Sequence, residues 1–113
     1  MNQSSLTADV QHQDGRCAIH LSGYLSSESA PPLEEAFAQA ADYDKILLVF
    51  EAKTFISSAG LAVLFDLILP LQEKGKQVRI AEPAAHFRKV FDIVGLSQDV
   101  DVFEDEAQAV AGW

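Results

Sequence analysis

The sequence predicts an α/β domain with a mixed sheet of four to five strands and helices packed on the sheet. Three observations support this class. An aspartate–glycine turn joins two strand-like runs near the start, strand-like and helix-like segments then alternate, and the most apolar run is short and rich in branched residues. The predicted order is β-β-α-β-α-β-α-(β)-α, which implies antiparallel pairing at the start and parallel pairing through the later crossovers. A chain of 113 residues is expected to form a single domain, residues 1–113.

The first two strands are predicted to form a hairpin. Strand-like runs extend from Ser5 to Gln11 and from Arg16 to Leu21, and Asp14-Gly15 stands between them. An aspartate–glycine pair between two such runs is a strong signal for a tight hairpin turn. The segment from Ser22 to Ser27 is predicted to be a loop after the second strand.

The first helix and the central strand follow. A helix is predicted from Pro32 to Ala41, because proline is tolerated in a first helical turn and apolar residues then recur at helical spacing. The polar segment from Asp42 to Asp44 ends this helix. The run from Ile46 to Phe50 is wholly apolar, which is typical of a strand that is covered on both faces.

The second helix is predicted to begin with Ser58 as its N-cap, because a serine hydroxyl can bond an otherwise unpaired backbone N–H there. At helical spacing, the side expected to face the sheet carries Leu61, Leu64, Phe65 and Ile68. The opposite side is unusually apolar for a solvent-facing surface and carries Ala59, Ala62, Val63, Asp66, Leu69 and Glu73. Either a second packing layer of this domain or a partner protein is expected to cover it. Pro70 is expected to kink or shorten the helix.

Four further elements complete the predicted order. Gln77 to Ala81 is predicted to be a strand and Pro83 to Val94 a helix. Val100 to Phe103 is predicted to be a last short strand, and Glu104 to Ala111 a terminal helix. These elements continue the alternation that indicates parallel pairing.

Composition argues against several classes of function. A formal net charge of −9 disfavours binding to nucleic acid or anionic lipid, since both attract basic patches. No apolar segment reaches the roughly 18 residues of a membrane span, so no membrane insertion is expected. The N-terminal residues lack the features of a secretion signal, and a cytoplasmic protein is expected. Cys17, the lone cysteine, is expected to be a buried apolar residue.

No catalytic arrangement is evident in the sequence. His12, His20 and His86 lie far apart on different predicted elements, and no Cys/His set has the spacing of a metal site. Ser58 lacks the G-x-S-x-G context of a nucleophile elbow, and no glycine-rich phosphate loop occurs. We therefore predict a protein that is not an enzyme, with no catalytic residue, metal or cofactor. A small α/β enzyme, for example a hydrolase, is the remaining enzymatic alternative.

Several motifs occur together and in a characteristic order. The block from Val49 to Leu64 contains F-I-S-S-A-G-L-A-V-L, and Ser22 to Ser26 reads S-G-Y-L-S. Phe87 to Leu96 reads FRKVFDIVGL, and Val102-Phe103 precedes Glu106-Ala107. Over nearly the whole chain, these motifs resemble the STAS domain family, and most closely its anti-sigma factor antagonists, also called anti-anti-sigma factors. The resemblance implies a STAS-like fold.

The resemblance also implies a partner-switching function. In that branch, the unphosphorylated antagonist binds an ATPase-fold serine/threonine kinase that is also an anti-sigma factor, and so releases a sigma factor or other client. The kinase phosphorylates the antagonist, which ends binding, and a metal-dependent serine phosphatase reverses the modification. Ser58 corresponds by position to the phosphorylated serine. The chain is thus expected to be a bacterial phosphoprotein of signal transduction and transcription regulation.

Two departures from the family pattern leave alternatives open. Ser26 and Ser57 stand where many members carry aspartate, and Ser57 becomes a second candidate for phosphorylation. The missing acidic side chains also favour another hypothesis, a constitutive STAS accessory subunit of a transporter, for example in lipid transport, without a phosphorylation cycle. The predicted partner-binding residues are Gly23, Tyr24, Ser26, Ser57, Ser58, Ala59, Ala62, Val63 and Asp66.

Overall fold

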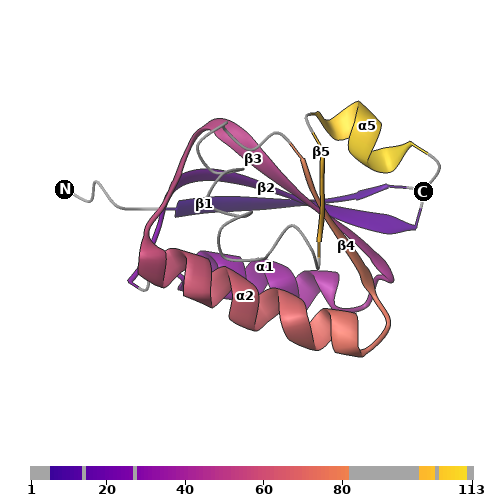
Figure 1. Cartoon of the computed structure of the whole chain (residues 1–113), viewed down its shortest axis with the longest axis horizontal. Helices are drawn as coiled ribbons and strands as arrows, with labels where there is room; N and C mark the ends of the chain where they lie inside the picture. Colours follow the sequence, from indigo (N-terminus) through magenta and orange to yellow (C-terminus); the bar gives the residue numbers. More distant parts are fainter. Residues whose placement is uncertain (1–5, 14, 27, 82–99, 104, 112–113) are drawn as a thin grey trace.

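The computed structural model (Figure 1) describes residues 6–13, 15–26, 28–81, 100–103 and 105–111. Their secondary structure is β1 (Leu6–Gln13), β2 (Arg16–Leu25), α1 (Pro31–Ala40), β3 (Lys45–Ile56), α2 (Ser58–Glu73), β4 (Gln77–Ala81), β5 (Asp101–Phe103) and α5 (Glu106–Val110). This order confirms the predicted mixed α/β class. The helix predicted from Pro83 to Val94 lies outside the described residues.

The strands form one five-stranded sheet in the order β1-β2-β3-β4-β5. β1 and β2 are antiparallel, and the pairing of Gln13 with Arg16 leaves a two-residue turn in which Gly15 has φ 79°. All later neighbours are parallel, as the crossovers predict. The hairpin and the mixed sheet inferred from the sequence are therefore confirmed.

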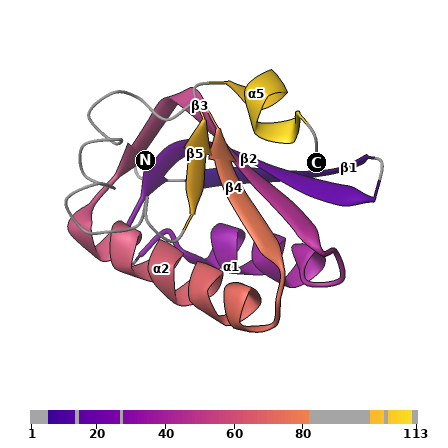
Figure 2. The same ribbon diagram turned by 45° about the vertical axis from the view of Figure 1, so that its right-hand side comes forward.

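The helices cover both faces of the sheet. α1 and α2 lie side by side on one face, whereas α5 lies on the opposite face (Figure 2). The larger core fills the space beneath α1 and α2 and includes Leu33, Phe50, Leu64 and Ile68. A smaller core on the other face joins Leu47, Val49 and Ala81 to Ala109 of α5. The central strand is thus buried on both faces, as its apolar run predicts.

Two predicted strands are longer than their apolar runs suggest. The segment predicted to be a loop from Ser22 belongs to β2 as far as Leu25, and β3 continues beyond Phe50 to Ile56. The register explains the extension, since Leu21 pairs with Phe50 but Gly23 pairs with Thr54. Residues 51–53 therefore stand opposite residue 22 alone, and pairing resumes after this irregularity.

Thr54 stabilises the sheet at this irregularity. Its side chain is 3% exposed, and its hydroxyl donates a hydrogen bond of 2.6 Å to the Leu21 carbonyl oxygen. A bulge interrupts the regular ladder, and a buried carbonyl left unpaired there would be costly. The threonine hydroxyl supplies the missing donor from within the partner strand.

The helix boundaries differ from the predictions in small ways. α1 runs over Pro31–Ala40, one residue earlier than predicted, because both prolines fit the first turn. Pro70 lies inside α2, which ends at Glu73 and is therefore not shortened at the proline. α5 covers only Glu106–Val110, because Asp105 caps it by accepting the Gln108 N–H at 2.8 Å.

The N-terminus of α2 packs directly against the end of β2. Gly60, in the first turn of α2, is buried, and a Cβ atom there would collide with the Leu25 carbonyl oxygen and lie 2.7 Å from its carbon. The colliding atoms belong to the backbone, so they cannot move aside as a flexible side chain could. Only glycine allows the helix and the strand to approach so closely.

We predict that Thr54→Val lowers the free energy of unfolding by about 1 to 2 kcal/mol, because the Leu21 carbonyl loses its donor while the buried volume is kept. Urea unfolding followed by circular dichroism measures the effect. Thr7→Val is the matched control, because Thr7 is an exposed strand residue and should change stability by less than about 0.5 kcal/mol. Equal stability of the two variants would contradict the role given to Thr54.

Gly60→Ala tests the contact between α2 and β2. Alanine at an unhindered helical position would stabilise the helix by about 1 kcal/mol relative to glycine. Here we expect a net loss of about 1 to 3 kcal/mol, because the new methyl group overpacks the junction with Leu25. Ala62→Gly at the exposed neighbouring position calibrates the propensity term in the same unfolding assay. A stabilising Gly60→Ala would show that the junction is looser than described.

Candidate partner-docking site

The first turn of α2 is capped by Ser57 and not, as predicted, by Ser58. Ser57 has extended backbone angles of φ −84° and ψ 170°, and its Oγ accepts a hydrogen bond of 3.0 Å from the Gly60 N–H. Its own N–H and Oγ both donate to the Leu25 carbonyl oxygen, at 2.9 and 3.3 Å. The helix begins at Ser58, one residue earlier than the prediction, because β3 ends at Ile56 and Ser57 alone forms the junction.

Ser58 is consequently the first residue of α2. The Ser58 side chain lies outside the described parts of the chain, so the backbone alone places this residue at the start of the helix. At that position a side chain lies at the positive end of the helix dipole, next to backbone N–H groups without helical partners. The first turn of α2 contains no acidic residue. Added negative charge at Ser58 would therefore meet a favourable local field.

Ser29, which is not among the predicted site residues, stabilises the loop after β2. The buried Ser29 hydroxyl donates to the Tyr24 carbonyl oxygen at 2.6 Å and accepts the Ser26 N–H at 2.9 Å. The Ser26 hydroxyl lies 3.3 Å from the Ser29 hydroxyl oxygen. The only signal for Ser29 in the sequence is its place in a serine-rich run before two prolines, where such local bonds are common. These bonds fix the loop that carries Ser26.

Two aromatic side chains are exposed beside this junction. Tyr24 is 37% exposed and Phe55 is 55% exposed, and they are direct neighbours across the parallel pairing of β2 with β3. The next pair, Leu25 and Ile56, points to the opposite face and packs in or against the larger core. Tyr24 belongs to the predicted set, but Phe55 does not. Strand alternation around the buried Thr54 could have identified it once β3 was known to continue.

The outer side of α2 has the predicted character. Ala59, Ala62 and Asp66 are exposed, and Leu69 is 40% exposed. Val63 differs from the prediction, because it is half-buried and packs against the larger core. The exposure of the other residues argues against a second packing layer formed by the described part of the chain. Ser57, Ser58 and Ala59 thus lie at the start of α2. Ala62 and Asp66 continue along its exposed side, whereas Val63 is turned toward the domain.

Within the described part of the chain, the remaining cysteine and histidine side chains do not form a catalytic or metal-binding cluster. No cluster of three or more potential metal ligands occurs there, and no described helix is both long and apolar enough to cross a membrane. Cys17 is fully buried, and burial raises the pKa of its thiol, so it is a poor nucleophile. His12 stacks on Tyr43 with ring centroids 4.9 Å apart, and His86 lies outside the described residues.

The fold is similar to solved structures of antagonist proteins. An anti-sigma factor antagonist from Mycobacterium paratuberculosis superposes with a TM-score of 0.82 at 21% sequence identity, over 97% of this chain and 95% of that one. The phosphorylated form of the Bacillus cell fate determinant SpoIIAA superposes with a TM-score of 0.71 at 19% identity, over 93% and 97% of the two chains. At these identities the likeness concerns the fold.

Sequence comparison gives two kinds of relative. The intermembrane phospholipid transport system binding protein MlaB of Haemophilus influenzae is 29% identical over 97 residues, which are 81% of this chain and 92% of that protein. The anti-sigma-B factor antagonist of Bacillus subtilis is 21% identical over 99 residues, or 87% and 91%. A sequence model described as the STAS domain matches residues 7–109. The chain therefore belongs to the STAS domain family.

Proposed function

We propose that this protein is an anti-sigma factor antagonist whose binding to a partner is ended by phosphorylation of Ser58. The partner is a serine/threonine kinase of the ATPase fold that is also an anti-sigma factor, and a metal-dependent serine phosphatase restores binding. The protein itself is a non-enzymatic binding module of the bacterial cytoplasm. The observation that carries this proposal is the exposed Tyr24–Phe55 pair beside the first turn of α2.

The exposed aromatic pair has the properties of a docking surface. Large aromatic side chains supply much of the free energy of protein interfaces, and exposed apolar side chains that are adjacent to one another are typical of an interaction site. Phe55 is only three residues from Ser58 in the sequence, and the intervening Ser57 is bonded to the β2 terminus. The aromatic pair lies on the face of the sheet opposite α2, so a partner would reach both the pair and the first residue of α2 by covering the end of β3.

Hydrogen bonding favours Ser58 over Ser57 as the phosphorylated residue. The Ser57 hydroxyl accepts from Gly60 and donates to the Leu25 carbonyl, so a phosphate on it would remove the donated hydrogen, set negative charge against that carbonyl oxygen and disturb the cap of α2. Modification at the next position leaves that cap in place. A phosphate adds roughly −1.5 to −2 charges and several acceptor oxygens. The α2 dipole favours that charge, so the modified domain is expected to remain folded.

The free energy needed for the switch is within reach of one phosphate. A thousandfold loss of affinity corresponds to about 4 kcal/mol. Desolvating a charge within an interface without a compensating group costs several kcal/mol. A partner seated over Ser58 would therefore be released by modification, whereas the domain itself would remain folded.

A constitutive transporter subunit is the second candidate function. The 29% identity to the phospholipid transport protein MlaB favours it, as do the serines at positions 26 and 57. This function would use the same surface without a phosphorylation cycle. Affinity purification with the unmodified chain from its host distinguishes the two, because recovery of an ATPase-fold kinase supports the switch and recovery of a transporter ATPase supports the alternative.

We predict that Ser58→Glu weakens binding to the recovered kinase by at least about tenfold, or about 1.4 kcal/mol, because it introduces a buried charge at the interface. Ser58→Ala should bind like the unmodified protein and should not be inactivated by kinase and ATP. Isothermal titration calorimetry gives the affinities, and circular dichroism checks that the fold is unchanged.

Ser58→Gln is the matched control for this experiment, since it has nearly the size of glutamate but no charge. It should retain most of the affinity that Ser58→Glu loses. Ser57→Ala should instead lower the stability of the domain by about 1 kcal/mol through loss of the N-cap. If Ser58→Glu bound the kinase as tightly as the unmodified protein, the proposed switch would be wrong.

A second prediction concerns the aromatic pair. Phe55→Ala should reduce affinity for the same partner by at least about 2 kcal/mol, because exposed aromatic residues at interface centres are typical hot spots. The stability of the free domain should change little, since the side chain is 55% exposed. Leu69→Ala is the control, because Leu69 is 40% exposed but lies more than two turns further along α2. Equal losses for both variants in calorimetry would place the interface elsewhere.

A further inference from the structure

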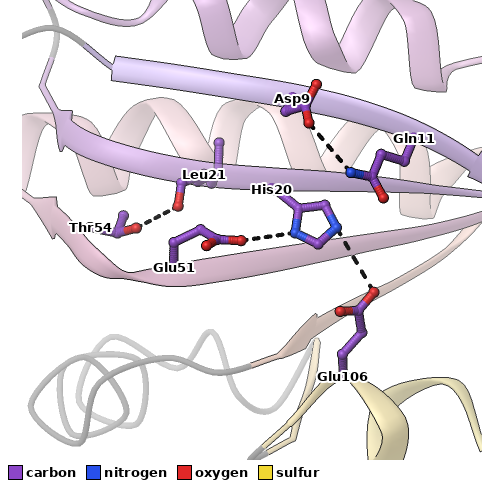
Figure 3. A network of polar contacts seen from close by, with 7 residues as sticks. All are labelled: Asp9, Gln11, His20, Leu21, Glu51, Thr54 and Glu106. Atoms are coloured by element: carbon purple, nitrogen blue, oxygen red, sulfur yellow. Dashed lines mark hydrogen bonds and ion pairs between the residues drawn. The ribbon is translucent and has the colours of Figure 1, made fainter.

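We propose that protonation of His20 fastens α5 to the sheet, which makes the C-terminal helix a pH-dependent cover of the face opposite α1 and α2. The inference rests on the polar contacts around His20 shown in Figure 3 and does not depend on the proposed partner switch. His20 projects from β2 toward Glu51 of β3 and Glu106 of α5. A proton on this side chain would thus connect two strands and a helix.

The hydrogen bond to Glu51 determines which ring nitrogen is available. His20 Nδ1 lies 2.9 Å from Glu51 Oε2, and a carboxylate only accepts, so Nδ1 carries the hydrogen. In the neutral ring Nε2 then has a lone pair and no hydrogen. Among the described residues, it is the only buried side-chain nitrogen or oxygen without a hydrogen-bond partner. A second proton would bind to this unsatisfied atom.

The nearest acceptor for that second proton is on α5. Nε2 lies 3.9 Å from Glu106 Oε2, which is too long for a hydrogen bond but within range of a charge–charge attraction. Glu106 is the first residue of α5, so a modest shift of the helix toward the ring would shorten the contact. Protonation would therefore both satisfy the buried nitrogen and attract the helix.

The other charged groups around the ring leave a negative surplus. Asp9 of β1 is the direct cross-strand neighbour of His20 and accepts a bond of 3.4 Å from Gln11. Arg16, on the strand of His20, lines a small cavity of about 30 Å³ together with Glu106. Arg79 of β4 also reaches this face, where its guanidinium donates to the Ala109 carbonyl. The three carboxylates of Asp9, Glu51 and Glu106 thus exceed the two arginines by one negative charge.

The attachment of α5 is weak enough for one charge to matter. A helix of five residues does not persist without tertiary contacts. α5 is held by the fully buried Ala109 and by a 2.7 Å hydrogen bond from the Arg79 guanidinium to the Ala109 carbonyl. Glu106 approaches His20 only while α5 is docked, so protonation stabilises the docked form alone. Docking should tighten as the pH falls from 8 to 5, the range in which histidines change charge.

Amide hydrogen exchange of the full chain, followed by NMR, tests this proposal. The Ala109 N–H bonds to the Asp105 carbonyl at 3.1 Å, so its protection reports whether α5 is formed. We expect its protection factor, corrected for the intrinsic exchange rate, to fall about two- to fivefold between pH 5.5 and pH 8. The Leu48 amide in the central strand is the internal reference and should not follow this change.

Two variants remove the proposed interaction from opposite sides. His20→Gln and Glu106→Gln should both abolish the pH dependence of Ala109 protection, and the second is a half-buried substitution that keeps the His20–Glu51 bond. His12→Gln is the matched control, because His12 is an exposed histidine that stacks on Tyr43, and it should leave the dependence intact. An unchanged pH dependence in His20→Gln or Glu106→Gln would overturn the proposal, as would a pH-independent protection factor in the unmodified chain.

Discussion

The Leu25 carbonyl at the end of β2 determines how the start of α2 is held against the sheet. It accepts the Ser57 N–H at 2.9 Å, it lies 3.3 Å from the Ser57 hydroxyl, and it occupies the space that a side chain at position 60 would fill. Serine and glycine are required there for different reasons, since one supplies the bonds and the other the space. Within the S-S-A-G sequence, Ser57 and Gly60 are therefore required for packing.

This constraint separates the serines that hold the fold from the serine that we propose to be phosphorylated. The Ser29 hydroxyl bonds the Tyr24 carbonyl in the loop after β2, and the Ser57 hydroxyl bonds the Gly60 N–H at the start of α2. Ser58 is not needed for the N-cap of α2. The same separation applies to the strands, because Thr54 repairs the bulge and Phe55 beside it remains exposed. A partner can thus use residues at the junction whose side chains contribute little to folding. Binding and stability can then change independently at adjacent positions.

Much of the fold follows from local pattern. The Asp14-Gly15 turn, the apolar run from Ile46 and the helical spacing in α2 each depend on neighbours in the sequence, and each was predicted. The irregularity between β2 and β3 was not, because it depends on a bond between Thr54 and Leu21, which are 33 residues apart. Without it the sequence pattern ends β3 at Phe50, so Phe55 is overlooked and the helix cap is assigned to the wrong serine. One missed long-range contact therefore explains these two errors, whereas the half-burial of Val63 is a separate one.

The serines at positions 26 and 57 increase the difference in charge between the unmodified site and the phosphorylated site that we propose. No acidic residue occupies the first turn of α2, so this turn carries no negative side chain before modification, although Asp66 is exposed about two turns further along the helix. Aspartate at positions 26 and 57 would place negative charge near this turn before any modification. With serine, a single phosphate would supply the negative charge at the start of α2. A partner that selects the unmodified form could then rely on apolar contact with Tyr24 and Phe55, and the difference in affinity between the two forms would arise mainly from desolvation of the phosphate.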